Sequence, residues 1–250
     1  MCFDEAFLST TGCSFHRCKM AIYDLYRPFY RSFYIKKAEC ALYLVVRLVK
    51  ERLNQMDFNQ DLLNQKRQFF VSANAGISLP VAGAIYWAAL AVAGFYLKPN
   101  QWTFVAYCTS GLLFPLGLAL QKPFKANLMV KNPLSGLIPY ALFSMMLSWG
   151  ITIPASSIDK SLVPLCLAIG MGIHWPIIGW VYSSKVCQLH ALLRTILVVA
   201  CWYLLPDDRF TILPLVVSAL YVLTVIGLKI EVNQARKQVS LGSSLTLITP

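Results

Sequence analysis

The sequence contains few charged residues. Aspartate, glutamate, lysine and arginine together make up 13% of the 250 residues, whereas 57% are hydrophobic. A soluble domain has roughly a quarter charged residues. The mean hydropathy of +0.58 shows the same bias. This composition excludes an ordinary soluble domain and indicates an integral membrane protein.

Acidic residues are missing from the long apolar runs. Between residues 69 and 228 the acidic side chains are Asp159, Asp207 and Asp208, and all three fall between runs. Proton pumps and carboxylate-dependent membrane enzymes usually need an acidic group within the membrane, for proton relay or metal binding. The HExxH, Walker lysine and GxSxG motifs are also absent from the sequence. We therefore expect no enzyme activity, no cofactor and no metal site.

Neither the basic charge nor the cysteine content points to another class of protein. The formal charge is +11, but the basic residues stand at the edges of apolar runs, without a zinc finger or an RNP-like motif, so no nucleic-acid partner is expected. Cys108, Cys166, Cys187 and Cys201 lie inside or at the ends of apolar runs. A free thiol there behaves as a small hydrophobe, so we expect no disulfide framework.

Six apolar runs follow residue 69, each long enough to cross a bilayer, which takes about 20 residues. Turn-forming and charged residues separate them. The sequence thus predicts an all-α, polytopic domain over residues 56–238, followed by a flexible tail over residues 239–250. The predicted spans are Phe69–Leu97, Gln101–Gln121, Ser135–Ala155, Leu162–Ser184, Val186–Leu205 and Phe210–Ile230.

The basic residues near the spans predict their orientation, because cytoplasmic loops retain lysine and arginine. Three basic residues fall on one side, namely Lys98, Lys160 and Arg209. The other side carries Lys66, Arg67, Lys122, Lys125, Lys131, Lys185, Lys229, Arg236 and Lys237. We expect the richer side, and with it both termini, to be cytoplasmic.

Residues 1–55 differ from the rest of the chain, and two interpretations remain open. The stretch "AECALYLVVRLVKERLNQ" is consistent with an amphipathic helix on the cytoplasmic membrane surface. Alternatively, translation begins at Met56, and the preceding stretch is not translated. The pattern Cys13-x-x-His16-x-Cys18 resembles part of a metal site but lacks a fourth ligand at a usable spacing.

A small polar set remains inside the predicted spans. His174 lies in the fourth span, and His190 and Arg194 lie four residues apart in the fifth, on one helix face. At about 1.5 Å per residue, His174 lies about 15 Å and Arg194 about 13 Å from the cytoplasmic ends of their spans. Pro176 cannot donate a hydrogen bond to the carbonyl of Gly172, so we expect a helix kink there and a free carbonyl oxygen.

Arg194 has no acidic partner within the predicted spans. A buried guanidinium without a partner is costly, so the side chain must extend to the interface, bind backbone carbonyls or hold an anion. If it extends to the interface, His174 only satisfies the kinked backbone. If it holds an anion, Arg194 and His174, with His190 beside them, form a basic recess for a small anionic solute or a lipid head group.

Two further patterns concern packing. "ISLPVAGAIY" (Ile77 to Tyr86) and "IHWPIIGWVY" (Ile173 to Tyr182) match at four positions, which leaves open an inverted repeat of two halves. Most tryptophans are near predicted span ends, where we expect them to anchor the protein at the membrane interface. They are Trp87, Trp102, Trp149, Trp180 and Trp202.

Four segments resemble a family of small bacterial integral membrane proteins classified as domain of unknown function 7010. They are "RQFF" before the first span, "GLLFPLG" in the second, "NPL" before the third and "MGIHWPIIGWVYS" in the fourth. The resemblance covers about Met56 to Leu228 and none of the first 55 residues. It implies a six-helix membrane protein with His174 and Pro176 as family features, and it supplies no activity or substrate.

The sequence therefore predicts a six-span protein of the bacterial cytoplasmic membrane, in contact with membrane lipids. Two functions are compatible with it. The first is a non-enzymatic, structural or accessory membrane protein. The second is a transporter or binder of a small anion or lipid head group, through Arg194, His174 and His190. The sequence does not indicate the oligomeric state.

Overall fold

The computed structural model describes residues 43–44 and 47–246, with side chains up to Val239. Every regular element in these residues is helical, as expected for an all-α protein. The chain divides into two units, Met1–Gln60 and Asp61–Pro250. In the first unit, residues 47–60 are helical and exposed. Cys13, His16 and Cys18 lie outside the described residues, as do residues 38–42 and 45–46 of the predicted amphipathic stretch.

The second unit begins with helical residues 61–72 and continues through ten further helices and two short 3-10 turns within its described part. The last helix runs through Thr246, into the segment predicted to be a flexible tail. In chain order the elements are η2 (Asn74–Gly76), α2 (Ser78–Tyr96), α3 (Pro99–Ser110), α4 (Leu113–Ala119), α5 (Gln121–Phe124), η3 (Pro133–Gly136), α6 (Leu137–Leu147), α7 (Trp149–Ile158), α8 (Leu162–Gly170), α9 (Trp175–Tyr182), α10 (Lys185–Leu204) and α11 (Ile212–Thr246).

Five stretches of the described residues are long and apolar enough to cross a membrane. A sixth span is formed if the bent pair of α3 and α4, at 51° to each other, is one crossing. This pair occupies the predicted second span. The five long stretches are Asn74–Tyr96, Pro133–Ile158, Leu162–Tyr182, Lys185–Leu204 and Ile212–Val239.

The bend between α3 and α4 has a local cause. Gly111 ends α3, and Pro115 lies in the first turn of α4, where it cannot donate to the carbonyl of Gly111. Two hydroxyls of the last turn of α3 also bond to its own carbonyls, Thr109 to Val105 at 2.7 Å and Ser110 to Tyr107 at 2.8 Å. Missing and competing hydrogen bonds of this kind are the usual origin of sharp helix bends.

A left-handed turn precedes α2, where the sequence predicted a continuous helix from Phe69. Asn74, Ala75 and Gly76 have φ values of 49°, 53° and 58°. Glycine adopts such values without strain and asparagine tolerates them, but alanine rarely does. The Asn74 side chain fixes the turn, because its amide donates to the carbonyl of Phe124 at 3.0 Å and its oxygen accepts from Arg236 at 2.8 Å.

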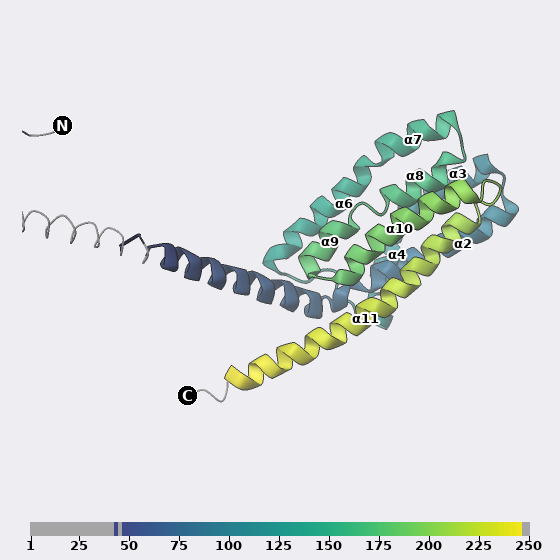
Figure 1. Cartoon of the computed structure of the whole chain (residues 1–250). Coiled ribbons are helices and arrows are strands. Elements are labelled where there is room, and N and C mark those ends of the chain that lie inside the picture. The colour runs from purple at the N-terminus through teal and green to yellow at the C-terminus, as the bar shows by residue number, and fades with distance from the viewer. Residues whose placement is uncertain (1–42, 45–46, 247–250) are drawn as a thin grey trace, which may run out of the picture. The chain divides into compact units, whose positions relative to one another are not determined.

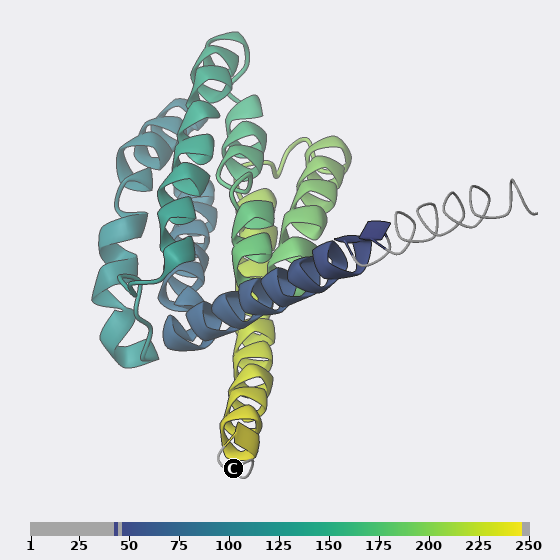
Figure 2. The same ribbon diagram turned by 90° about the vertical axis from the view of Figure 1, so that its left-hand side faces the viewer.

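The helices of the second unit run roughly side by side (Figures 1 and 2). The helix α11 packs against α2 and α10, and α10 also packs against α8 and α9. The span Pro133–Ile158 lies at the periphery, since 11% of its most apolar window is buried, compared with 61% for Asn74–Tyr96. The core therefore lies between α2, α8, α9, α10 and α11.

Two tryptophans lie in this core rather than at the membrane interface. Trp87 and Trp102 are both 0% exposed, and the indole of Trp102 donates to the carbonyl of Leu90 at 2.9 Å. The prediction that they anchor the protein at the interface is therefore wrong. Their size explains the outcome, because a buried indole fills a large volume between packed helices.

Candidate functional site

Arg194 lies in the middle of the core. It is the tenth of the twenty residues of α10, and its side chain is 1% exposed. One terminal nitrogen, Nη1, donates to the hydroxyl of Tyr221 on α11 at 2.8 Å. The guanidinium carbon lies 5.2 Å from the ring centre of Tyr221 and 5.4 Å from that of Trp87 on α2. Within the described residues it has no carboxylate partner.

Two glycines make room for this arrangement. A Cβ atom on Gly172 would lie 3.2 Å from Cδ of Arg194, closer than most real Cβ contacts. A Cβ atom on Gly83 would lie 2.8 Å from ring atoms of Tyr221. The absence of a side chain at each position thus allows the arginine and the tyrosine to meet between α2, α10 and α11.

His190 lies one helical turn before Arg194 and is 3% exposed. Its Nδ1 atom lies 2.6 Å from the hydroxyl oxygen of Thr224 on α11. The imidazole ring is 4.3 Å from the ring of Trp175 and 4.8 Å from that of Tyr221, measured between centroids. His190 is therefore enclosed by aromatic rings and one hydroxyl.

His174 comes from the break between α8 and α9. Its ring centre lies 5.5 Å from that of Trp175, and the ring centre of Trp175 lies 4.3 Å from that of His190. The structure thus brings the three residues singled out in the sequence, His174, His190 and Arg194, into one cluster.

The kink near Pro176 differs from the sequence prediction. Residues 171–174 form turns, His174 caps the N-terminus of α9, and Pro176 lies in the first turn of that helix. Proline is well tolerated there, because the first N–H groups of a helix have no partner within it. The carbonyl of Gly172 accepts from the N–H of Trp175 at 3.1 Å, so the expectation that it is free is wrong.

We name the six residues that meet in the core the Arg194 cluster. Each has a ring or charge contact with Arg194 or with another member, and all are buried except the half-buried His174; they are Trp87, His174, Trp175, His190, Arg194 and Tyr221. Tyr221 and Trp175 were not expected at the site from the sequence, and Trp87 was assigned to the membrane interface. Tyr221 is the tenth residue of α11, as Arg194 is of α10. The position of Tyr221 in the middle of a predicted span could have indicated a polar partner for Arg194.

The Arg194 cluster contains more hydrogen-bond donors than it uses. Of the eight buried side-chain polar atoms without a hydrogen-bond partner in the described residues, six belong to the cluster: Nε and Nη2 of Arg194, Nε1 of Trp87, Nε1 of Trp175, Nδ1 of His174 and Nε2 of His190. The guanidinium and indole nitrogens can only donate. Buried polar groups are normally paired, so this cluster is chemically suited to an added acceptor.

The described residues show no group of three or more histidine, cysteine, aspartate or glutamate side chains that could hold a metal ion. The cluster itself offers two imidazoles and a cation. A nearby positive charge opposes metal binding, so the donor set does not suit a metal.

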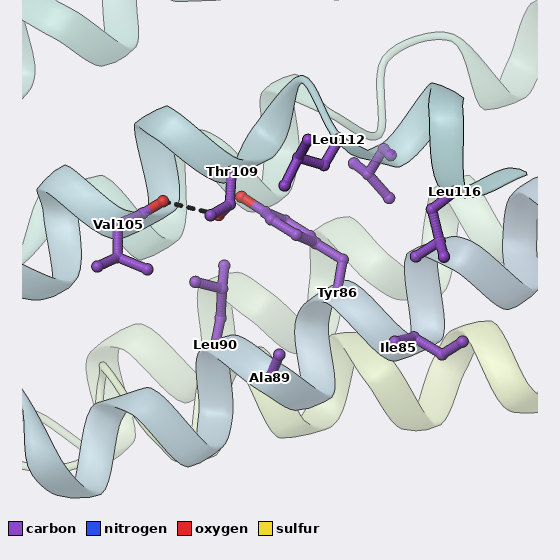
Figure 3. Close-up of a pocket in the computed structure, with 9 residues that line it drawn as sticks. Ile85, Tyr86, Ala89, Leu90, Val105, Thr109, Leu112 and Leu116 are labelled. Carbon is purple, nitrogen blue, oxygen red and sulfur yellow. Dashed lines mark hydrogen bonds between the residues drawn. The ribbon is translucent and has the colours of Figure 1, made fainter.

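A separate pocket lies between α2, α3 and α4, beside the bend (Figure 3). Its volume is about 260 Å³, and its lining is almost wholly apolar. The bend holds Leu112 and Leu116 away from Ile85 and Leu90 of α2. No residue of the Arg194 cluster lines this pocket.

The comparison with protein families gives one match. Residues 62–231 match the model described as "Family of unknown function (DUF7010)". No curated protein and no solved structure matches the chain. The matched segment contains every residue of the Arg194 cluster and all the helices long and apolar enough to cross a membrane, except the end of α11. The chain belongs to the DUF7010 family.

Proposed function

We propose that the protein binds a small anion in the middle of its helix bundle, at the Arg194 cluster, and that it does so as a multi-pass membrane protein without enzyme activity. The observation that carries this proposal is the guanidinium of Arg194. It is 1% exposed, has two nitrogens without a hydrogen-bond partner and faces no carboxylate in the described part of the chain.

The charge of Arg194 supports an anion as the ligand. A cation at the centre of a bilayer is costly, by about 2.5–3.5 kcal/mol on insertion scales. The rings of Trp87 and Tyr221 offset part of this cost, since a cation over an aromatic face gains about 0.5–2 kcal/mol. An anion would neutralise the charge and accept from the free Nε and Nη2 groups at the same time.

The position of Arg194 favours a small solute over a lipid head group. Nine residues separate it from the start of α10 at Lys185, which corresponds to about 13 Å at 1.5 Å per residue. A head-group phosphate would have to leave the interface and cross that distance through apolar surroundings. A small anion needs only an opening between helices.

The break at residues 171–174 supports transport as the purpose of binding. The span Leu162–Tyr182 is interrupted near its middle, and the interruption lies against Arg194 through Gly172. Transporters commonly bind their substrates at interrupted helices near the bilayer midplane. The geometry therefore supports a transporter more than a static scaffold.

A structural role is the second candidate, and one observation favours it. Arg194 already has a hydrogen bond to Tyr221 and two ring contacts, and these contacts join α2, α10 and α11. In this case the cluster only holds the bundle together, and no anion alters its stability.

We further propose that the protein resides in a bacterial cytoplasmic membrane with both termini on the cytoplasmic side. The nine basic residues assigned to the cytoplasmic side support this orientation, because three of them contact residues at one end of the second unit. Lys66 lies over the ring of Trp180, Lys229 lies 5.8 Å from the ring of Phe124, and Arg236 binds Asn74. The positive-inside rule supports the orientation.

Thermal unfolding of the full chain in a mild detergent tests the binding function. The melting temperature is measured in sodium chloride, acetate, phosphate and gluconate at constant ionic strength, with and without anionic lipid. A bound anion at a hundredfold excess over its Kd adds about 2.7 kcal/mol to the stability. We expect chloride or acetate to raise the melting temperature over gluconate, and anionic lipid to have no such effect.

Two arginine variants complete this experiment. Arg194→Met removes the charge with little change in length and should abolish the anion-dependent shift. Arg209→Met is the matched control, because Arg209 binds the carbonyl of Trp202 and the hydroxyl of Ser161 outside the cluster. It should retain the shift. If no anion stabilises the wild type, or if Arg194→Met responds as the wild type does, the structural role is correct.

A further inference from the structure

The hydrogen bonds of Thr224 fix the proton on His190. The Thr224 hydroxyl donates to the carbonyl of Leu220, one turn earlier in α11, at 2.7 Å. A hydroxyl has a single proton, so it has none left for His190. The contact of 2.6 Å between this hydroxyl oxygen and Nδ1 of His190 is attractive only if Nδ1 carries a proton and donates it.

The other ring nitrogen of His190 is therefore the one that can gain a proton. In a neutral imidazole with the proton on Nδ1, the atom Nε2 is an acceptor with a free lone pair. Nε2 is buried and has no hydrogen-bond partner within the described residues. It is thus an acceptor in a cluster whose remaining free atoms are mainly donors.

The groups around His190 oppose a second proton on its ring. Arg194, on the same helix, places a positive charge one turn away, and His174 approaches from the break between α8 and α9. On α11 the ring faces Tyr221 and Thr224, and Trp175 of α9 covers it on another side. None of these groups carries a negative charge. A proton on Nε2 would be unfavourable in the cluster as it stands.

An anion bound to Arg194 reverses this effect. It neutralises the arginine charge and provides an acceptor for a proton on Nε2. By linkage, if protonation of His190 raises the affinity for the anion, anion binding raises the affinity for the proton by the same factor. We infer that anion binding at the Arg194 cluster takes up one proton on Nε2 of His190, so that the ligand is an anion together with a proton.

This inference rests on the proposed anion binding and adds a second component to the ligand. The proton moves from hydronium in the solvent to the lone pair of Nε2, so one O–H bond breaks, one N–H bond forms and no other covalent bond changes. The charge of the cluster is the same before and after, since the proton and the anion cancel. An electrically neutral pair is also the form in which an ion enters an apolar bundle with least cost.

The pH dependence of chloride affinity tests the inference. Chloride itself does not titrate, and the full chain is studied in detergent between pH 5 and pH 8, with gluconate keeping the ionic strength constant. If one proton binds with each chloride, the Kd increases about tenfold per pH unit where free His190 is neutral and the complex is protonated. His190→Gln should bind chloride with no pH dependence in this range.

Two further measurements make the result independent of how well that variant folds. In a weakly buffered solution with a pH dye, adding chloride to the wild type should remove about one proton from solution per chloride bound. His174→Gln removes the other histidine of the cluster and should keep the tenfold slope, whatever its affinity.

The outcomes separate the two proposals. Chloride binding that requires Arg194 but has the same Kd at all pH values, or takes up no proton, overturns the proton inference and leaves anion binding intact. A pH slope that persists in His190→Gln and vanishes in His174→Gln also overturns it. The absence of chloride binding at every pH overturns both proposals.

Discussion

The hydrogen bond between Arg194 and Tyr221 gives a sharp test of how the core tolerates its buried charge. In Tyr221→Phe, the ring and its contacts with Trp175, His190 and the guanidinium remain, and only the hydroxyl is lost. Arg194 then has no hydrogen bond left in the described part of the chain. A hydrogen bond to a charged group contributes about 1.5–3 kcal/mol, so we expect a loss of that size.

Tyr86→Phe is the matched control for this substitution. Tyr86 is also buried, at 7% exposure, and its hydroxyl donates to the carbonyl of Ala106 at 2.9 Å. Both partners of this bond are neutral, so its loss should cost about 0.5–1.5 kcal/mol. The two variants thus remove the same atom from the same kind of side chain, and they differ in the charge of the partner.

Equilibrium unfolding in mixed micelles of a mild and a denaturing detergent measures both losses. For a chain of this size, 1 kcal/mol corresponds to about 2–4 °C in melting temperature. Tyr221→Phe should therefore lower the melting temperature by roughly 3–12 °C, about twice the change in Tyr86→Phe. If Tyr221→Phe costs no more than Tyr86→Phe, Arg194 does not depend on Tyr221, and the reasoning about its buried charge fails.

Two other predictions concern a helix contact and a loop. Gly94→Ala should destabilise the protein by about 1–3 kcal/mol or more in the same unfolding assay, because its Cβ would overlap the backbone carbonyl of Phe210. In Gly150→Ala the new Cβ has no atom within 4 Å, so the substitution should stabilise α7 by up to about 1 kcal/mol. An equal loss of stability in Gly94→Ala and Gly150→Ala would contradict this reasoning. The hydroxyl and then the backbone N–H of Ser161 hold the pKa of Asp159 below its usual range. Because this pKa is lower in the folded than in the unfolded state, the ionised carboxylate stabilises the loop at pH values above the unfolded-state pKa, and the effect is lost as the pH falls through the folded-state pKa. Ser161→Ala removes the hydroxyl, so carboxyl NMR should show a higher Asp159 pKa in this variant than in the wild type.

The positions of the membrane helices could be predicted from the sequence, because length and hydropathy alone decide whether a run can cross a bilayer. The internal breaks could not. Gly111 ends α3 and Ser148 separates α6 from α7, but both lie within long apolar runs, and hydropathy says nothing about the path of the backbone. Pro176 was a visible signal, but proline is compatible both with a kink and with the first turn of a new helix.

The composition of the Arg194 cluster was only partly predictable. His174, His190 and Arg194 stood out because polar side chains are rare in the spans. Tyr221 and Trp87 did not, since tyrosine and tryptophan are common in membrane helices and are usually assigned to the interface. Their roles depend on which helices are neighbours, and a single sequence does not contain that information. The orientation of the termini also remains a prediction from the charge distribution.

The partnership between α10 and α11 has a consequence for biosynthesis. When Arg194 leaves the ribosome inside an apolar segment, its hydrogen-bond partner Tyr221, 27 residues later in the chain, has not yet emerged. An isolated helix of this kind inserts at a cost of about 2.5–3.5 kcal/mol for the arginine alone. The last two helices should therefore enter the bilayer together as a hairpin. A nascent chain that stops before residue 221 should leave α10 poorly inserted and exposed to membrane proteases.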